Sequence, residues 1–156
     1  MTSTTPLIIV CDSREHRPFE FSSAVRVERR ALAAGDYSLA GLEDRVVVER
    51  KTLGDLLGSI THGRERFVKE LRQLRAFSLA VLMIEADWST ILAGDYRADV
   101  APSAVVGSLM AFSIKYGIVP ILAGDHETGA ILTERLLGNY ARLLECDAAM
   151  LRKAVA

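Results

Sequence analysis

The feature that most constrains how this chain folds is a hydrophobic run that ends in three charged residues, Val46-Val47-Val48-Glu49-Arg50-Lys51. Consecutive β-branched residues favour a buried strand. Because side chains alternate along a strand, Glu49 and Lys51 project to one face of the sheet and Arg50 projects to the other. We therefore expect a carboxylate and an ammonium group side by side at the end of a strand.

This pair of charges suits the hydrolysis of a phosphodiester at neutral pH. That reaction needs an activated water, neutralisation of the charge that builds on the phosphate, and help for the leaving oxygen. A carboxylate-bound Mg²⁺ beside a lysine can supply all three. One carboxylate seldom holds Mg²⁺, which prefers several oxygen ligands. The sequence should therefore contain a second acid that reaches the same place.

Asp36 is the first candidate for this second acid. It lies thirteen residues before Glu49, which is enough for two antiparallel strands and a turn at Gly41. Pairing of these strands would bring Asp36 and Glu49 to the same end of the sheet. Asp12 and Glu15, at the end of the first apolar run, are candidates for a third metal-binding carboxylate or for a hydrogen-bonding role.

The rest of the chain alternates between strand-like and helix-like patterns. Strands are expected at 7–10, 25–29, 45–49, 80–84 and 118–122, with entry into a further strand at 35–37, and helices at 52–59, 64–75, 102–116 and 126–144. We expect residues 25–50 to be antiparallel and residues 85–100 to be a polar connection. Gly117 fits a helix C-cap and Asp125 an N-cap. The pattern predicts an α/β sandwich, in which helices flank a mixed sheet.

Four segments resemble, in order, the signature of the XPF-type nuclease domain. Gly35-Asp36-Tyr37 resembles its G-D motif, and Val48-Glu49-Arg50-Lys51-Thr52-x-x-Asp55 resembles its E-R-K-x-x-x-D motif. Cys11-Asp12-Ser13-Arg14-Glu15 is similar to its V-D-x-R-E segment, and 63–74 lies where members carry a basic helix. The resemblance covers roughly residues 8–76. It implies the restriction-endonuclease-like (PD-(D/E)XK) fold, a three-layer sandwich with a central mixed β-sheet.

The resemblance also implies an activity and roles for individual residues. Members cut DNA near branches, flaps or junctions with a divalent metal, so Mg²⁺ is the expected ion and Mn²⁺ a substitute. Asp36 and Glu49 would bind the metal, and Lys51 would position or activate the attacking water. Asp12 would complete or support the metal site, and Glu15 would support catalysis. Further supporting residues would be Arg14, Arg50 and Asp55.

Basic residues are concentrated in the first half of a chain whose net charge is only −1. Phe67, Leu71 and Leu74 fall within about 60° of a helical projection, and Lys69 and Arg72 lie outside this sector. One helix can therefore pack on the core and also contact phosphates. The residues expected to contact DNA are Arg14, Arg50, Arg64, Arg66, Lys69 and Arg72. Alternatively, the basic helix is a solvated face, and Arg50 hydrogen-bonds a carboxylate such as Asp55 or Glu15.

The length of 156 residues indicates a single domain, with a core expected over residues 7–145. XPF-type proteins usually add a tandem helix-hairpin-helix module, for which this chain has no room. We therefore expect a nuclease domain that stands alone, forms a homodimer, or recruits a DNA-binding partner protein. Its expected setting is DNA repair, recombination or phage DNA processing.

The composition is that of an ordinary globular domain, with 50% hydrophobic and 25% charged residues. No apolar run approaches the length of a membrane span and no signal sequence opens the chain, so a cytoplasmic protein is expected. The two cysteines, Cys11 and Cys146, have no metal-binding spacing, and we expect both to be buried. Trp88, Tyr96 and Tyr116 are expected to be core or packing residues rather than platforms on which bases stack.

A second class of function stays open. The chain could be a non-catalytic module that binds DNA or mediates dimerisation, or a subunit that needs a partner for activity. A decayed nuclease normally loses some of its acids. Here Asp36, Glu49 and Lys51 are all present, which favours the enzyme.

Overall fold

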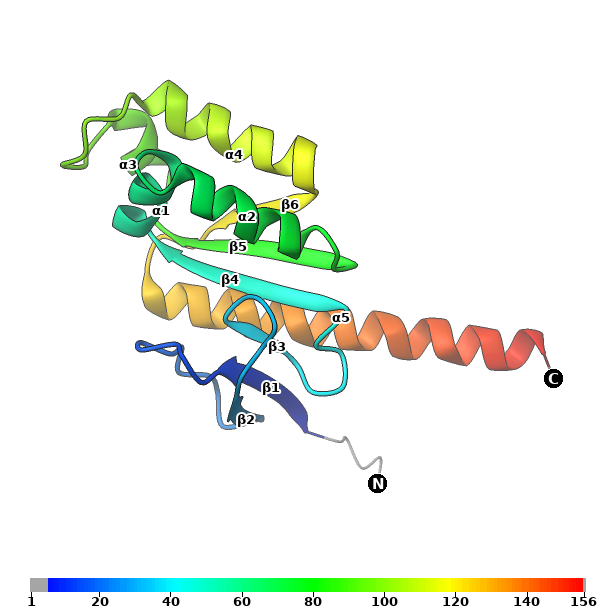
Figure 1. Cartoon of the computed structure of the whole chain (residues 1–156). Coiled ribbons are helices and arrows are strands. Elements are labelled where there is room, and N and C mark those ends of the chain that lie inside the picture. Colours follow the sequence, from blue (N-terminus) through cyan, green and yellow to red (C-terminus); the bar gives the residue numbers. More distant parts are fainter. Residues whose placement is uncertain (1–5, 156) are drawn as a thin grey trace.

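The computed structural model describes residues 6–155. Its strands form a six-stranded sheet with the order β2-β1-β3-β4-β5-β6 (Figure 1). The strands are β1 (Leu7–Asp12), β2 (Val25–Arg30), β3 (Tyr37–Leu39), β4 (Val46–Thr52), β5 (Leu79–Glu85) and β6 (Ile118–Leu122). The helices are α1 (Leu53–Ile60), α2 (Arg64–Leu74), α3 (Trp88–Ala93), α4 (Pro102–Tyr116) and α5 (His126–Ala154).

Helices cover both faces of this sheet. Helices α1, α2 and α4 lie on one face and α5 crosses the other (Figure 1). Side chains alternate along β4, so the strand contributes to the core on both faces of the sheet. Val47 packs against α1, α2 and α4, and Val46 and Val48 pack on the α5 side. Burial on two faces explains why the first six residues of β5 and the first three residues of β4 are continuously apolar. The predicted three-layer α/β sandwich with a mixed sheet is confirmed.

The direction of β2 differs from the prediction. β3 is antiparallel to β4, as expected, with Tyr37 opposite Val48, and it is also antiparallel to β1. β2, however, pairs parallel with β1 at the sheet edge, and Val27 lies beside Ile9. The connection between these strands is anchored by Phe19, which is buried on the α5 side and stacks on Tyr37 with 4.9 Å between ring centroids. Because this connection crosses back over the sheet, β2 starts at the same end as β1.

The helices follow the predicted pattern with two exceptions. Gly117, with φ of +68°, ends α4, and the side chain of Asp125 caps α5, as predicted. The short helix α3 was not expected, although Asp87 caps its start and Gly94, in the left-handed conformation, ends it. Both are recognisable helix signals. The first residue of α3, Trp88, is 39% exposed, so the expectation that this side chain belongs to the core was wrong. α5 continues to Ala154, beyond the predicted end near residue 144, and extends past the sheet (Figure 1).

The two cysteines have different environments. Cys11 is buried in β1, as expected, but Cys146 is exposed on α5, so the prediction of burial was wrong for Cys146. The reason is that Cys146 lies beyond Leu137, the last of the buried residues of α5. Within residues 6–155, no helix has the length and apolar character required to span a membrane.

Candidate active site

A turn that requires glycine determines the position of Asp36. Gly35 has φ of +72°, and a Cβ atom at this residue would lie 2.1 Å from Cγ2 of Val47. The backbone N–H of Asp36 donates to the carbonyl of Val48 at 2.9 Å, and the carbonyl of Asp36 accepts from the N–H of Asp12 at 2.8 Å. Main-chain hydrogen bonds to β4 and β1 therefore hold Asp36 directly before β3.

Glu49 and Lys51 project to the same side of β4, as the alternation predicted. Nζ of Lys51 lies 3.1 Å from Oε1 of Glu49 and 3.6 Å from Oε2 of Glu70, which comes from α2. The ammonium group also lies 4.9 Å from the centroid of the Phe67 ring. Because the Lys51 and Glu49 side chains are only 13% and 15% exposed, both hold defined positions at the edge of the core.

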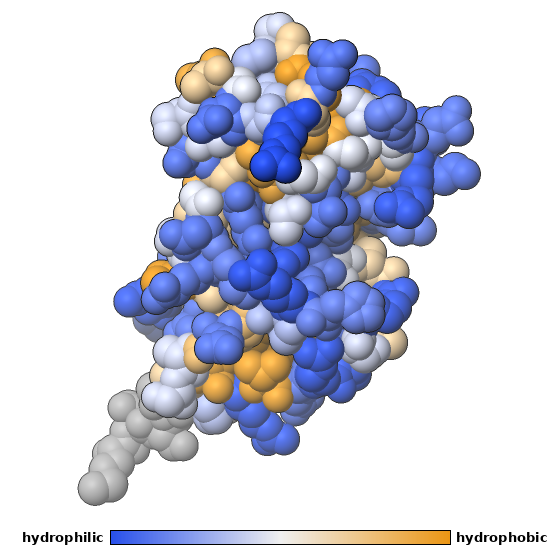
Figure 2. All heavy atoms as spheres, turned by 90° about the vertical axis from the view of Figure 1, so that its left-hand side faces the viewer, coloured by the Kyte–Doolittle hydropathy of each residue, from blue (hydrophilic) through white to orange (hydrophobic). Residues whose placement is uncertain are grey.

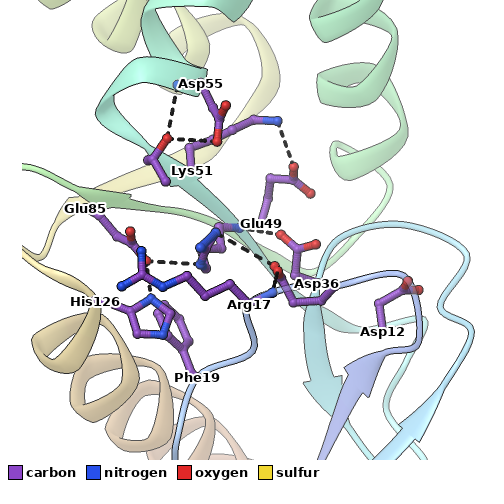
Figure 3. Close-up of polar contacts among 12 residues, drawn as sticks. Asp12, Arg17, Phe19, Asp36, Glu49, Lys51, Asp55, Glu85 and His126 are labelled. Carbon is purple, nitrogen blue, oxygen red and sulfur yellow. Dashed lines mark hydrogen bonds and ion pairs between the residues drawn. The ribbon is translucent and has the colours of Figure 1, made fainter.

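Asp36, Glu49 and Lys51 line one hollow of about 420 Å³, together with Glu15 and Arg66. In Figure 3, the carboxylates of Asp36 and Glu49 lie next to each other, although Asp36 comes from the turn before β3 and Glu49 from β4. The N–H of Arg50 donates to Oδ2 of Asp36 at 2.7 Å, which directs that carboxylate toward the end of β4. The structure therefore brings together the three residues on which the catalytic prediction depends.

The two carboxylates share an environment that disfavours negative charge. Burial raises the pKa of Asp36 to about 7, and the nearby charge of Glu49 adds to this rise. Burial also raises the pKa of Glu49, although the ammonium group of Lys51 opposes this change. A divalent cation between the carboxylates would relieve their repulsion, and carboxylate oxygens are preferred ligands of Mg²⁺. The two acids therefore fit a divalent metal ion.

These two acids would need other ligands to complete a metal site. Among residues 6–155, no group of three or more His, Cys, Asp or Glu side chains is arranged to hold a metal ion. Water and substrate oxygens are the usual remaining ligands of Mg²⁺, which gives up its hydration water reluctantly. Asp36 and Glu49 would thus form an open site, accessible to a phosphate from the hollow.

Lys51 is held in its cationic form. Burial lowers its pKa, but the charge and hydrogen bond of Glu49, with further contributions from Glu70 and Asp36, outweigh burial and raise it. A protonated lysine can orient a water molecule or stabilise negative charge on a phosphate, but it cannot accept a proton. Of the two roles predicted for Lys51, this geometry favours positioning over activation by proton transfer.

Asp12 lies outside this group of residues. Its carboxylate accepts from the N–H and the guanidinium of Arg14 at 2.8 Å and from the N–H of Leu32 at 2.7 Å. The hydrogen bond from Arg14 is the main reason that the pKa of Asp12 lies well below its usual range. Both carboxylate oxygens are occupied, and Asp12 does not line the hollow. The geometry assigns Asp12 and Arg14 to support of the loop that leads to Asp36.

Arg50 also borders the hollow, but its guanidinium lies in a buried group of charges. Its Nε lies 3.0 Å from Oε1 of Glu85, and one terminal nitrogen lies 3.9 Å from Oε2 of Glu15. Nδ1 of His126, at the start of α5, lies 2.6 Å from the same Glu85 oxygen (Figure 3). The side chain of Arg50 is only 8% exposed and stacks over the ring of Phe19. Arg50 therefore binds carboxylates in the described structure, which was the alternative to a DNA contact.

Glu85 and His126 were not found from the sequence. Glu85 ends β5, which is parallel to β4, and it lies beside Thr52 in the register. Because the carboxyl ends of parallel strands meet at one edge, this position was a usable signal. His126 directly follows the N-cap of α5, and no sequence pattern links it to Arg50.

Asp55 stabilises the start of α1. The hydroxyl of Thr52 accepts from the N–H of Asp55 at 3.1 Å and donates to its carboxylate at 2.8 Å. This reciprocal pairing resembles the capping box that the spacing of the two residues suggested.

Helix α2 offers positive charge at the rim of the hollow. Phe67, Leu71 and Leu74 are buried as predicted, whereas the basic residues Arg64, Arg66, Lys69 and Arg72 are exposed. Arg66 lines the hollow itself. Figure 2 shows the face onto which β4 ends, and hydrophilic side chains cover most of it.

Comparisons with known proteins agree with this arrangement. Two structures of XPF from Aeropyrum pernix superpose on this fold with 23% identity each. The complex with DNA has a TM-score of 0.70 and covers 87% of this chain and 66% of the other chain. The second structure has a TM-score of 0.69 and covers 92% and 69%.

A relative from Methanocaldococcus jannaschii, named "Putative ATP-dependent RNA helicase MJ1505", is 29% identical over 128 residues. The match covers 81% of this chain but only 15% of that protein. The model of the ERCC4 domain matches residues 11–135, which include Asp12, Asp36, Glu49 and Lys51. From this match and the shared fold we conclude that the chain belongs to the ERCC4 domain family.

Proposed function

We propose that this protein is a divalent-metal-dependent DNA endonuclease that hydrolyses phosphodiester bonds at branched or flap-like DNA. The observation that supports the proposal best is the pair of buried carboxylates, Asp36 and Glu49, beside the cationic Lys51 in an open hollow. The two carboxylates would bind the metal ion, and the ammonium group of Lys51 would neutralise negative charge on the phosphate. A setting in repair, recombination or phage DNA processing belongs to the same proposal.

Each residue of the hollow has a distinct role in this proposal. Asp36 and Glu49 would hold Mg²⁺ or Mn²⁺, which when bound polarises the phosphate and lowers the pKa of a water. Lys51, fixed by Glu49 and Glu70, would place its ammonium group next to the reacting phosphate. Glu15 faces the same hollow and raises the pKa of Asp36 further through its charge, so its role would be electrostatic.

DNA would approach over α2. Arg66 lines the hollow and Arg64, Lys69 and Arg72 are exposed on the same helix, so a duplex near the site would meet several cations. Arg50 is buried and held by Glu85, so it would support the site and not contact phosphates. Arg14 is paired with Asp12, but its side chain is 70% exposed, so it stays a predicted DNA contact. This division modifies the set of DNA-contacting residues that the sequence suggested.

The test is cleavage of labelled flap, fork, Holliday-junction, single-stranded and duplex DNA with Mg²⁺, Mn²⁺ or EDTA. RNA substrates belong in the panel because the named relative from Methanocaldococcus is called an RNA helicase. Asp36→Ala should abolish metal-dependent cutting, whereas Asp44→Ala, a matched change at an exposed aspartate before β4, should cut like the wild type. Equal cutting by the Asp36 variant would refute the assignment.

Binding of these substrates without cutting would instead support the non-catalytic or partner-dependent alternative. A homodimer or a partner protein stays a prediction, and a concentration-independent monomer mass in sedimentation would exclude the homodimer.

A further inference from the structure

A second hollow lies beside the candidate active site and differs from it in character. It has a volume of about 450 Å³ and lies between α1 and the segment 96–100. Leu53, Leu57, Tyr96 and Val100 line it, so its wall is largely apolar. The hydroxyl of Tyr96 donates to the carbonyl of Val100 at 2.9 Å, which holds the ring in place without using the hollow. Tyr96 packs against the core, as predicted, but it also faces this space.

The two hollows meet across α1. Gly54 and Gly58 line both of them and, being four residues apart, lie on one face of the helix. A Cβ atom on Gly58 would meet no atom within 4 Å, and a Cβ on Gly54 would meet only the hydroxyl of Thr52 at 4.0 Å. At the two residues that border both hollows, therefore, no side chain projects between them. A polymer with one unit in the active site can extend its next unit into the apolar hollow.

The charge at the second hollow fits a nucleic-acid strand. Arg97 and His62 line it and are exposed, and Asp99 is an acidic residue in the same lining. Arg66 lies at the connected active-site hollow. Cations at both hollows can neutralise phosphates on either side of the nucleotide that lies between them. Figure 2 shows apolar atoms among strongly hydrophilic ones in the upper part of this face, where α1 and residues 96–100 lie (Figures 1 and 2).

We propose that the hollow between α1 and residues 96–100 binds an unpaired nucleobase of the substrate strand, next to the phosphate that lies at Asp36 and Glu49. This inference rests on the proposed function, because it names where the strand continues. An apolar wall with a fixed aromatic ring suits a base of any sequence, since every base has a flat apolar face and stacks on aromatic side chains. Recognition would then depend on whether the strand is unpaired and not on its sequence.

The experiment combines one protein change with one DNA change. Gly58→Gln would fill the passage between the hollows, and glutamine is a better helix former than glycine. Gly107→Gln is the matched control, because Gly107 is an exposed helical glycine of α4 whose Cβ would also meet no atom within 4 Å. The DNA is a flap oligonucleotide in which single bases near the cut are removed one at a time to leave abasic sites.

Affinity is measured by fluorescence anisotropy in EDTA and cleavage is measured in Mg²⁺. We expect one abasic position to weaken binding and cutting by the wild type and by the Gly107 variant about tenfold, the size of one lost base contact. In the Gly58 variant, the intact and abasic substrates should behave alike. Circular dichroism and thermal unfolding show that both variants fold.

Two outcomes would overturn the inference while leaving the proposed function intact. One is that the wild type cuts intact DNA and no abasic position weakens its binding. The other is that the abasic penalty persists in Gly58→Gln, which would mean that the glutamine obstructs only the active site. If an abasic position weakens DNA binding by the wild type but the protein cuts nothing, the result supports the base-binding hollow and contradicts the nuclease proposal. Absence of both binding and cutting would overturn both.

Discussion

Replacing Asp36 with asparagine should stabilise the metal-free protein at high pH and not at low pH. Burial and the charge of Glu49 raise the pKa of Asp36 from its ordinary 3.8 to about 7. Since each pKa unit corresponds to 1.36 kcal/mol, ionised Asp36 lowers the free energy of unfolding by up to about 4 kcal/mol. Asparagine carries no charge and keeps an oxygen that can accept from the N–H of Arg50, so the variant avoids this cost.

The sign follows from proton binding. Between pH 4 and pH 7 the folded protein holds a proton on Asp36 that the unfolded chain has released, so the wild type loses stability as the pH rises through this range. The Asn variant lacks this loss. We expect it to be more stable than the wild type by roughly 2–4 kcal/mol at pH 8, with the difference vanishing near pH 4.

The assay is urea unfolding at pH 4, 6 and 8 in EDTA, followed by circular dichroism. Addition of Mg²⁺ at pH 8 should stabilise the wild type more than the variant, because the ion binds only the folded protein and the variant lacks one of its ligands. A difference between the proteins that is the same at all three pH values, or an Asn variant that is less stable at pH 8, would refute the reasoning.

Three further predictions concern the scaffold and the DNA surface. Gly35→Ala should destabilise the fold by about 3 kcal/mol or more in urea unfolding, since it combines a left-handed φ with a Cβ clash; a loss below 1 kcal/mol would contradict the clash. Arg50→Leu should cost up to about 3–5 kcal/mol because it leaves the buried carboxylate of Glu85 with only the imidazole of His126, and adding Glu85→Gln should recover part of the loss in a double-mutant cycle; additive losses would show that the pair is not coupled. Changing Lys69 and Arg72 together to Gln should weaken DNA binding and reduce the salt slope by up to about two units; an unchanged slope would return α2 to the role of a solvated face.

Regular alternation explains why the centre of the site could be predicted. The positions of Glu49 and Lys51 on one face of β4 follow from strand geometry, and the antiparallel pairing of β3 with β4 brings Asp36 to them. These relations depend on spacing within about fifteen residues. Sequence-local rules therefore sufficed for the residues on which the catalytic proposal depends.

Contacts between segments that are far apart in the chain could not be predicted from the sequence. The partner of β2 depends on how the preceding connection packs under α5, and His126 meets Glu85 across 41 positions of the chain. Asp12 was expected at the metal because of its motif. A carboxylate two residues from an arginine can instead pair with that arginine, and only the geometry distinguishes metal binding from this ion pair. The helix α3 is different, because its cap signals were present and were overlooked.

The main-chain attachment of Asp36 separates the shape of this domain from its chemistry. Because backbone hydrogen bonds to β1 and β4 position the residue, the frame of the site does not depend on the carboxylate that occupies it. A single change of that carboxylate to an amide would leave the sheet, the basic helix and both hollows in place. Under the proposed function, one nucleotide substitution, which changes this aspartate codon to an asparagine codon, would remove catalysis and keep the same surface.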